Sequence, residues 1–127
     1  MEAVKMLLAK DFTFDAAHNL INYHGKCERL HGHTYRLRVV VEGTPDSEGM
    51  IIDFIELKAV VKEKILSRLD HSYINEIISQ PSAENIALWI WNELEESVKR
   101  ENCGLYEIHV WETADSRVIL RRSDMTK

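Results

Sequence analysis

Three of the six histidines in this chain are spaced so that their side chains can meet. His31 and His33 are two residues apart at the start of an alternating apolar segment, so in an extended strand both point to the same face of a sheet. His18 follows an earlier alternating segment and shares the parity of its apolar side. If the two segments pair as antiparallel strands, the end of the first lies beside the start of the second. The three imidazoles would then converge at one end of the sheet.

Inward-facing imidazoles need a partner, because burying an unpaired polar ring costs free energy. A zinc ion satisfies that need, and three histidine ligands leave a fourth coordination position open, as in catalytic zinc sites. The alternative is a set of ordinary strand-end histidines bonded to backbone groups. Because the third histidine is in phase with the other two, the pattern favours the metal site.

Cys27 lies four residues before His31, in the polar loop between the two segments. A nearby zinc ion or imidazolium lowers the pKa of a thiol and supplies a thiolate that can act as a base. A buried, inert thiol is equally compatible with this position. Cys103, in a connection far from any motif, is better interpreted as inert.

Further acid–base groups lie at the ends of expected elements. Asp70 and His71 close the first expected helix and could form a relay. Adjacent residues on a helix do not face each other, however, which favours a histidine stabilised by the helix dipole. Glu112 shares the parity of Ile108 and Val110, so its carboxylate projects from the buried face at a strand end. There it could accept hydrogen bonds from a flat heterocycle or pair with an arginine.

Period-two alternation predicts strands over 6–16 and 31–42, and later over 106–111 and 117–122. Two apolar stripes at helical spacing, capped by Asp53 and Ser82, predict helices between the two strand pairs. The expected fold is an α+β domain in the order ββααββ, an antiparallel four-stranded sheet with two helices on one face. His24 and His109 have no evident partner and are interpreted as surface or loop residues.

Length, composition and charge limit the kinds of protein that this chain can be. With 127 residues, 45% hydrophobic and 29% charged, residues 1–127 are expected to form a single domain. The net charge of −5 and the lack of a basic run argue against nucleic-acid binding. No run of ~18 apolar residues could span a bilayer, and no signal-peptide pattern opens the chain. Two cysteines without a disulfide framework favour a cytoplasmic location.

Six short motifs occur in order along the chain. They are FTFDAAH at 12–18, CERLHGH at 27–33, IDF at 52–54, LDH at 69–71, PSAEN at 81–85 and WET at 111–113. Together they resemble the 6-pyruvoyltetrahydropterin synthase / 6-carboxytetrahydropterin synthase family. The short length and the LDH context are most similar to the 6-carboxytetrahydropterin synthases of queuosine and archaeosine biosynthesis.

The resemblance implies a tunnelling fold (T-fold), in which the sheets of several subunits join into a barrel. It also implies a homohexamer of two trimers with active sites at subunit boundaries. The implied substrate is 7,8-dihydroneopterin triphosphate. The residue roles it implies are Zn²⁺ binding by His18, His31 and His33, proton transfer by Cys27 with Asp70 and His71, and pterin binding by Glu112 with help from Thr113.

The implied products differ between branches of the family. Loss of triphosphate and acetaldehyde leaves 6-carboxy-5,6,7,8-tetrahydropterin, whereas triphosphate elimination alone leads to the 6-pyruvoyl product. Some relatives carry glutamate at the Cys27 position and perform a retro-aldol cleavage, which makes Glu28, beside Cys27, a second candidate base. A non-catalytic, zinc-stabilised assembly module is the rival of another class, with Cys27 as a fourth metal ligand.

Overall fold

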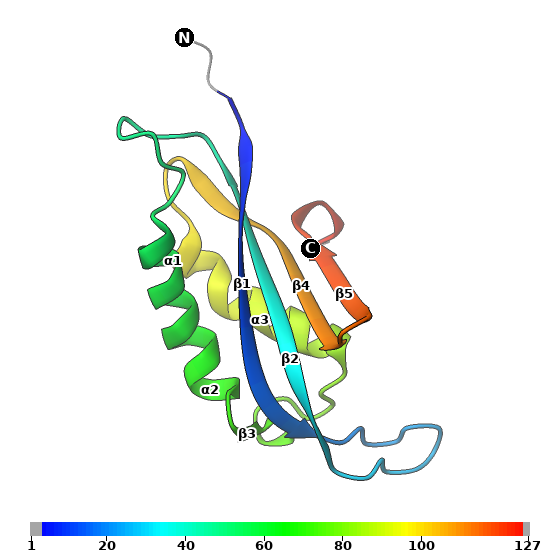
Figure 1. The fold of residues 1–127 in the computed structure, drawn as a ribbon. Coiled ribbons are helices and arrows are strands. Elements are labelled where there is room, and N and C mark those ends of the chain that lie inside the picture. Colours follow the sequence, from blue (N-terminus) through cyan, green and yellow to red (C-terminus); the bar gives the residue numbers. More distant parts are fainter. Residues whose placement is uncertain (1–3, 126–127) are drawn as a thin grey trace.

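The computed structural model describes residues 4–125, which form one mixed sheet and two helical segments (Figure 1). Along the chain the elements are β1 (Met6–His18), β2 (His31–Gly43), α1 (Phe54–Val61), a π-helical turn (Lys62–Leu66), α2 (Ser67–Leu69), β3 (Ser72–Tyr73), a 3-10 turn (Ile74–Glu76), α3 (Ala83–Val98), β4 (Cys103–Thr113), β5 (Ser116–Arg121) and a last 3-10 turn (Arg122–Asp124). None of the helices within residues 4–125 is long and apolar enough to cross a membrane.

The sheet has the strand order β3-β1-β2-β4-β5. The four long strands pair antiparallel, as expected from their alternation. The structure has one strand more than the four expected. The additional strand, β3, pairs in parallel with β1, Ser72 with Ala16 and Tyr73 with Ala17. A two-residue strand is too short to produce a periodic pattern, so sequence alternation could not reveal it.

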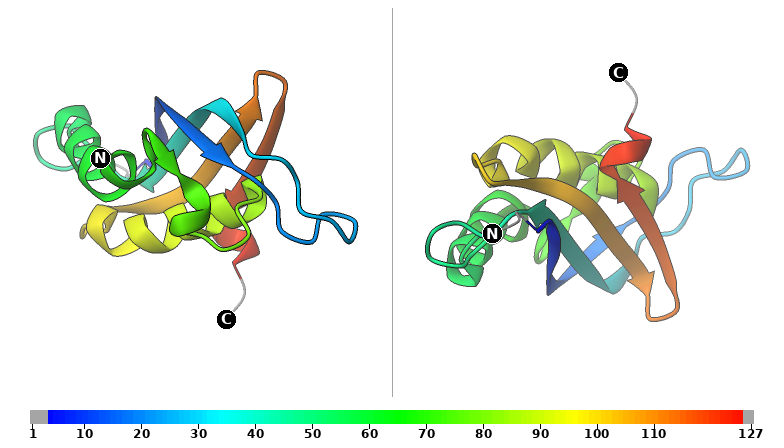
Figure 2. Two further views of the ribbon diagram at one scale, coloured as in Figure 1. Left: turned by 90° about the horizontal axis from the view of Figure 1, so that it is seen from below. Right: turned by 90° about the horizontal axis from the view of Figure 1, so that it is seen from above.

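The α-helices cover one face of this sheet (Figures 1 and 2). Both predicted caps are present, since the side chain of Asp53 accepts a hydrogen bond from the Ile55 amide and that of Ser82 from the Asn85 amide. The core lies between the helices and the inward parity of the strands. Its fully buried side chains include Phe14, Tyr35, Leu37, Leu57, Ile65, Leu69, Ile86, Ile90 and Leu94.

The register of β1 and β2 places the histidine-bearing ends of the two strands side by side. His18 is directly opposite His31, and Ala16 is opposite His33. The loop 19–30 connects these ends and extends beyond the edge of the sheet, away from the helices (Figure 2). The loop that carries Cys27 therefore begins and ends at residues of the histidine cluster.

Candidate metal centre

The structure brings His18, His31 and His33 together at this end of the sheet. The ring centroids of the three pairs are 4.7, 5.2 and 4.8 Å apart, and every pair meets edge to face. The Nε2 atoms of His18 and His31 are 3.1 Å apart. One ligand atom from each histidine and one carboxylate oxygen of Glu112 lie within 4.8 Å of one another.

In His18 and His31, the hydrogen bond made by Nδ1 determines which ring nitrogen carries the hydrogen. Nδ1 of His18 lies 2.8 Å from the carbonyl oxygen of Pro81, and Nδ1 of His31 lies 2.8 Å from that of Arg29. A carbonyl only accepts, so in each ring Nδ1 must donate, and Nε2 of the neutral ring is then a lone pair. A hydrogen bond between the two Nε2 atoms would require one ring to be an imidazolium. A cation between them satisfies both lone pairs, with carbonyls orienting the rings as in protein metal sites.

His33 completes the set. Its Nε2 is buried and has no hydrogen-bond partner in the described structure. Burial lowers the pKa of His33, which favours the neutral ring that a metal ion needs. Converging imidazole lone pairs are a donor set that suits zinc and other divalent transition metals. The residues present therefore fit a bound metal ion.

Glu112 lies against this group. Its Oε1 is 3.0 Å from Nε2 of His18 and 3.5 Å from Nε2 of His33. The carboxylate thus projects from the predicted face, but its partners are histidines rather than an arginine. A register shift between Trp111 and Thr113 marks this end of β4. The negative charge beside three ring nitrogens further favours a cation at the centre.

The structure does not bring every predicted residue into this group. Cys27 is exposed in the loop 19–30, and it is not one of the four clustered donors among the described residues. Thr113 is exposed at the end of β4, where its hydroxyl donates to the carboxylate of Asp115 at 3.0 Å.

The expectation that Asp70 and His71 belong to the helix, and so point apart, is wrong. The helix ends at Leu69, Asp70 has extended backbone angles, and His71 has a φ of 60°. Oδ2 of Asp70 therefore lies 3.1 Å from Nδ1 of His71. The backbone of Asp15 holds the pair, because its amide donates to Oδ1 of Asp70 and its carbonyl accepts from the His71 amide. The Asp15 hydrogen bond lowers the pKa of Asp70.

A shallow hollow of about 560 Å³ lies beside His71, where β1, β2 and β3 meet. Its lining includes Thr34 and His33 of β2 as well as His71. One residue of the Asp70–His71 pair and one of the histidine cluster therefore line the same surface depression.

The interpretation of His109 as a surface or loop residue is wrong, because the side chain is buried. Its side chain is 9% exposed, and its Nε2 lies 2.8 Å from Oε1 of Glu107. Oε2 of Glu107 also accepts from Nε of Arg121 at 2.9 Å. Long side chains cover this helix-free face of the sheet, for example Arg36 over the ring of Trp111. Alternation alone assigns such a face to solvent.

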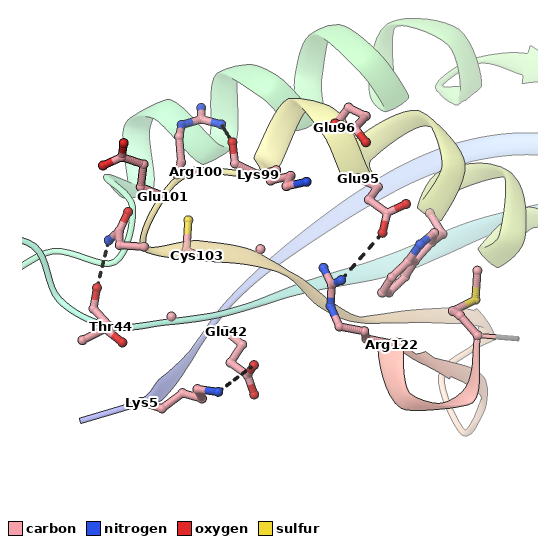
Figure 3. A pocket seen from close by; sticks show the side chains of 15 residues that line it. Lys5, Glu42, Thr44, Glu95, Glu96, Lys99, Arg100, Glu101, Cys103 and Arg122 are labelled. Carbon is pink, nitrogen blue, oxygen red and sulfur yellow. Dashed lines mark hydrogen bonds and ion pairs between the residues drawn. The ribbon is translucent and has the colours of Figure 1, made fainter. Parts of the chain in front are cut away.

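A second hollow of about 650 Å³ lies at the opposite end of the sheet, between α3 and the start of β4 (Figure 3). Two ion pairs lie within its lining, Lys5 with Glu42 at 3.7 Å and Arg122 with Glu95 at 3.8 Å. No histidine occurs among the described residues that line it. It offers no donor set comparable to the histidine cluster.

Known proteins resemble this chain in sequence and in fold. The sequence model described as 6-pyruvoyl tetrahydropterin synthase matches residues 7–123. The 6-carboxy-5,6,7,8-tetrahydropterin synthase of Synechocystis sp. is 40% identical, over 87% of this chain and 88% of its own length. The protein of the same name from Haemophilus influenzae is 37% identical, over 86% and 94%. The structure of Plasmodium falciparum 6-pyruvoyl tetrahydropterin synthase superposes with a TM-score of 0.77 at 24% identity, over 93% of this chain and 98% of the other.

Proposed function

The chain belongs to the 6-pyruvoyl tetrahydropterin synthase family, and we propose that it is a zinc-dependent 6-carboxy-5,6,7,8-tetrahydropterin synthase. It would convert 7,8-dihydroneopterin triphosphate to the 6-carboxy product with release of acetaldehyde and triphosphate, in the biosynthesis of queuosine or archaeosine. The convergence of ring nitrogens from three histidines, two of them with the Nε2 lone pair set by a backbone carbonyl, carries the metal-dependent part of this proposal. The names of the Synechocystis and Haemophilus relatives support the carboxy branch.

His18, His31 and His33 would hold the ion. When bound, zinc supplies Lewis acidity, which lowers the pKa of an oxygen that it contacts. As a thiolate, Cys27 would take the proton from the substrate side chain, and its exposed position leaves it open to a ligand. Movement of the loop 19–30 or the bound substrate would have to bring the thiol to the cluster, since catalytic contacts are often looser before substrate binds.

Asp70 and His71 would form the partner relay. The carboxylate orients the imidazole through Nδ1, which leaves Nε2 of His71 to exchange a proton with the substrate. This imidazole is exposed, with 79% of its side chain accessible, so a substrate or a neighbouring subunit can reach it.

Glu112 would anchor the pterin ring. Its side chain is 36% exposed, and a carboxylate can accept hydrogen bonds from both the ring N–H and the 2-amino group. Thr113 follows it in the chain and would assist. The position of Glu112 against His18 and His33 also favours a second candidate, a closed four-ligand site in a non-catalytic assembly module.

We propose a cytoplasmic homohexamer of two trimers. Apart from its contact with β3 at Ala16 and Ala17, the outer edge of β1 is unpaired within the described residues, and β5 ends the sheet on the other side. Apolar side chains near the β1 edge, including Met6, Leu7 and Phe54, line an apolar hollow. Unpaired edges beside apolar surface favour pairing between copies. Sedimentation that gives an active monomer at micromolar concentration would contradict the assembly.

Product analysis tests the proposed activity. Metal-loaded protein is incubated with 7,8-dihydroneopterin triphosphate, and the pterin and the small products are separated. Acetaldehyde with the 6-carboxy compound supports the carboxy branch. The 6-pyruvoyl compound without acetaldehyde identifies the alternative synthase, and 6-hydroxymethyl-dihydropterin identifies retro-aldol cleavage.

A further inference from the structure

The loop that carries Cys27 is closed at its base by Glu28. The Glu28 amide donates to the carbonyl of Leu20 at 2.9 Å, and the Leu20 amide donates to Oε1 of Glu28 at 3.0 Å. One residue thus bonds both backbone groups of another residue eight positions away. We propose that Glu28 is a positioning residue that orders the backbone of the loop 19–30 next to Cys27, and that its carboxylate acts through the Leu20 contact rather than as the base. This inference rests on the proposed role of Cys27.

The other end of this contact is fixed to the body of the protein. Before Leu20, the Asn19 amide donates to Oδ1 of Asn75 at 3.0 Å, and the Asn75 side chain donates back to the Asn19 carbonyl at 2.8 Å. After Leu20, the Ile21 amide donates to Oε1 of Gln80. Leu20 is therefore flanked by residues tied to the segment before α3, and Glu28 binds an anchored point.

The tip of the loop depends less on this anchor. A turn closes it, in which the Lys26 amide donates to the Tyr23 carbonyl at 3.1 Å. His24 and Gly25 have φ values of 51° and 80°. Cys27 lies between this turn and Glu28, so the Glu28–Leu20 contact is the nearest one that ties the backbone of Cys27 to the anchored start of the loop. Loss of that contact would free Cys27 together with the turn.

The contacts of Glu28 account for its side chain as a structural acceptor in the loop. Its Oε1 already accepts the Leu20 hydrogen bond, whereas the thiol of Cys27 is exposed. Oε1 also lies 3.9 Å from Nδ1 of His31, but that nitrogen donates to the Arg29 carbonyl at 2.8 Å. Glu28 therefore lies beside a cluster histidine without sharing its hydrogen. The observed role of Oε1 is therefore to hold the loop closed, and the substitutions below test whether the carboxylate also moves a proton.

Two substitutions separate positioning from proton transfer. Glu28→Gln keeps an acceptor oxygen for the Leu20 amide but removes the basic carboxylate, and Glu28→Ala removes both. Glu96→Ala, on the exposed side of α3, is the matched control. For each protein we would measure amide hydrogen exchange across 19–30, and kcat and KM with 7,8-dihydroneopterin triphosphate.

We expect Glu28→Ala to speed exchange of the Leu20 amide at least about tenfold, because an opened hydrogen bond loses protection. Its kcat should fall about 10- to 100-fold with a smaller change in KM, since misplacement of a reacting group by about 1 Å costs up to 10²-fold. Glu28→Gln and Glu96→Ala should stay within about threefold of wild type in both measurements.

Two results would overturn the proposal. Normal exchange in Glu28→Gln with turnover as low as in Glu28→Ala would make the carboxylate a chemical participant. Unchanged Leu20 exchange in Glu28→Ala would show that the contact does not order the loop. If wild-type protein forms no product, the proposed function fails, and the exchange data still decide whether Glu28 orders the loop.

Discussion

Nε2 of His18 and Nε2 of His31 face each other across 3.1 Å while the other nitrogen of each ring bonds a backbone carbonyl. Two neutral imidazoles in this arrangement present lone pair to lone pair. The two lone pairs repel each other, whereas a cation between them would be attracted to both. The local structure of the chain therefore already defines a metal-binding geometry.

The first prediction concerns metal content. We expect about one zinc ion per chain, with Zn–N distances of about 2.0–2.1 Å in an X-ray absorption spectrum. His33→Ala should lose the ion, because it removes one of three converging ring nitrogens. His24→Ala, in the exposed loop, should keep it. Zinc at a hundred times its dissociation constant should add about 2.7 kcal/mol to the free energy of unfolding of wild type. Equal metal content in the two variants would refute the assignment.

The second prediction separates two roles for Glu112. If it anchors the pterin, Glu112→Gln should raise KM and leave zinc content unchanged, because the amide replaces one of the two acceptor oxygens by an NH2 donor. If Glu112 is a metal ligand, zinc affinity should fall together with activity. Competition with a chromophoric chelator gives the affinity, and initial rates give KM. A lowered zinc affinity would remove Glu112 from the pterin site.

The third prediction concerns Cys27. Cys27→Ala should keep zinc and pterin binding but lose about 10²–10⁴-fold in turnover, which is the usual effect of removing a general base. Cys103→Ala, in the half-buried second cysteine, is the control and should retain activity. Zinc content and product formation are measured on the same samples. Turnover of Cys27→Ala within a few-fold of wild type would exclude Cys27 from the mechanism.

The fourth prediction concerns acid stability. Hydrogen bonds from Arg38, then from Arg36, lower the pKa of Asp11 from 3.8 to about 2, against the opposing effect of burial. A depressed native pKa stabilises the fold above the unfolded value and loses that effect as pH falls through the native value. Asp11→Asn should therefore reduce the free energy of unfolding above pH 3.8, with the deficit shrinking between pH 3.8 and about 2. Urea titrations across this range, with Asp124→Asn as control, measure it. A deficit independent of pH would contradict it.

Much of the fold follows from alternation and capping signals in the sequence. The parity of His18, His31 and His33 predicted their convergence, because period two fixes which side chains share a face. Both helix caps were equally local signals, with Asp53 and Ser82 accepting from amides two and three residues ahead. Such features depend on neighbouring residues alone, so a single sequence reveals them.

Other features depend on contacts that sequence patterns do not encode. Asp70 and His71 meet because the chain leaves the helix at Leu69 and bonds to the backbone of Asp15. That contact joins segments 55 residues apart and leaves no periodic signal. His109 is buried by Glu107 and by long side chains on the helix-free face, which simple alternation treats as solvent-exposed.

The most direct test of the central claim is acetaldehyde release from 7,8-dihydroneopterin triphosphate by one preparation in three states. The protein is assayed as zinc-loaded, after removal of zinc by a chelator, and after zinc is restored. Metal-dependent catalysis at the histidine cluster predicts acetaldehyde and 6-carboxy-5,6,7,8-tetrahydropterin in equal amounts from the first and third samples, and neither from the second. Equal product from the zinc-free sample, or no acetaldehyde from the zinc-loaded one, would contradict it.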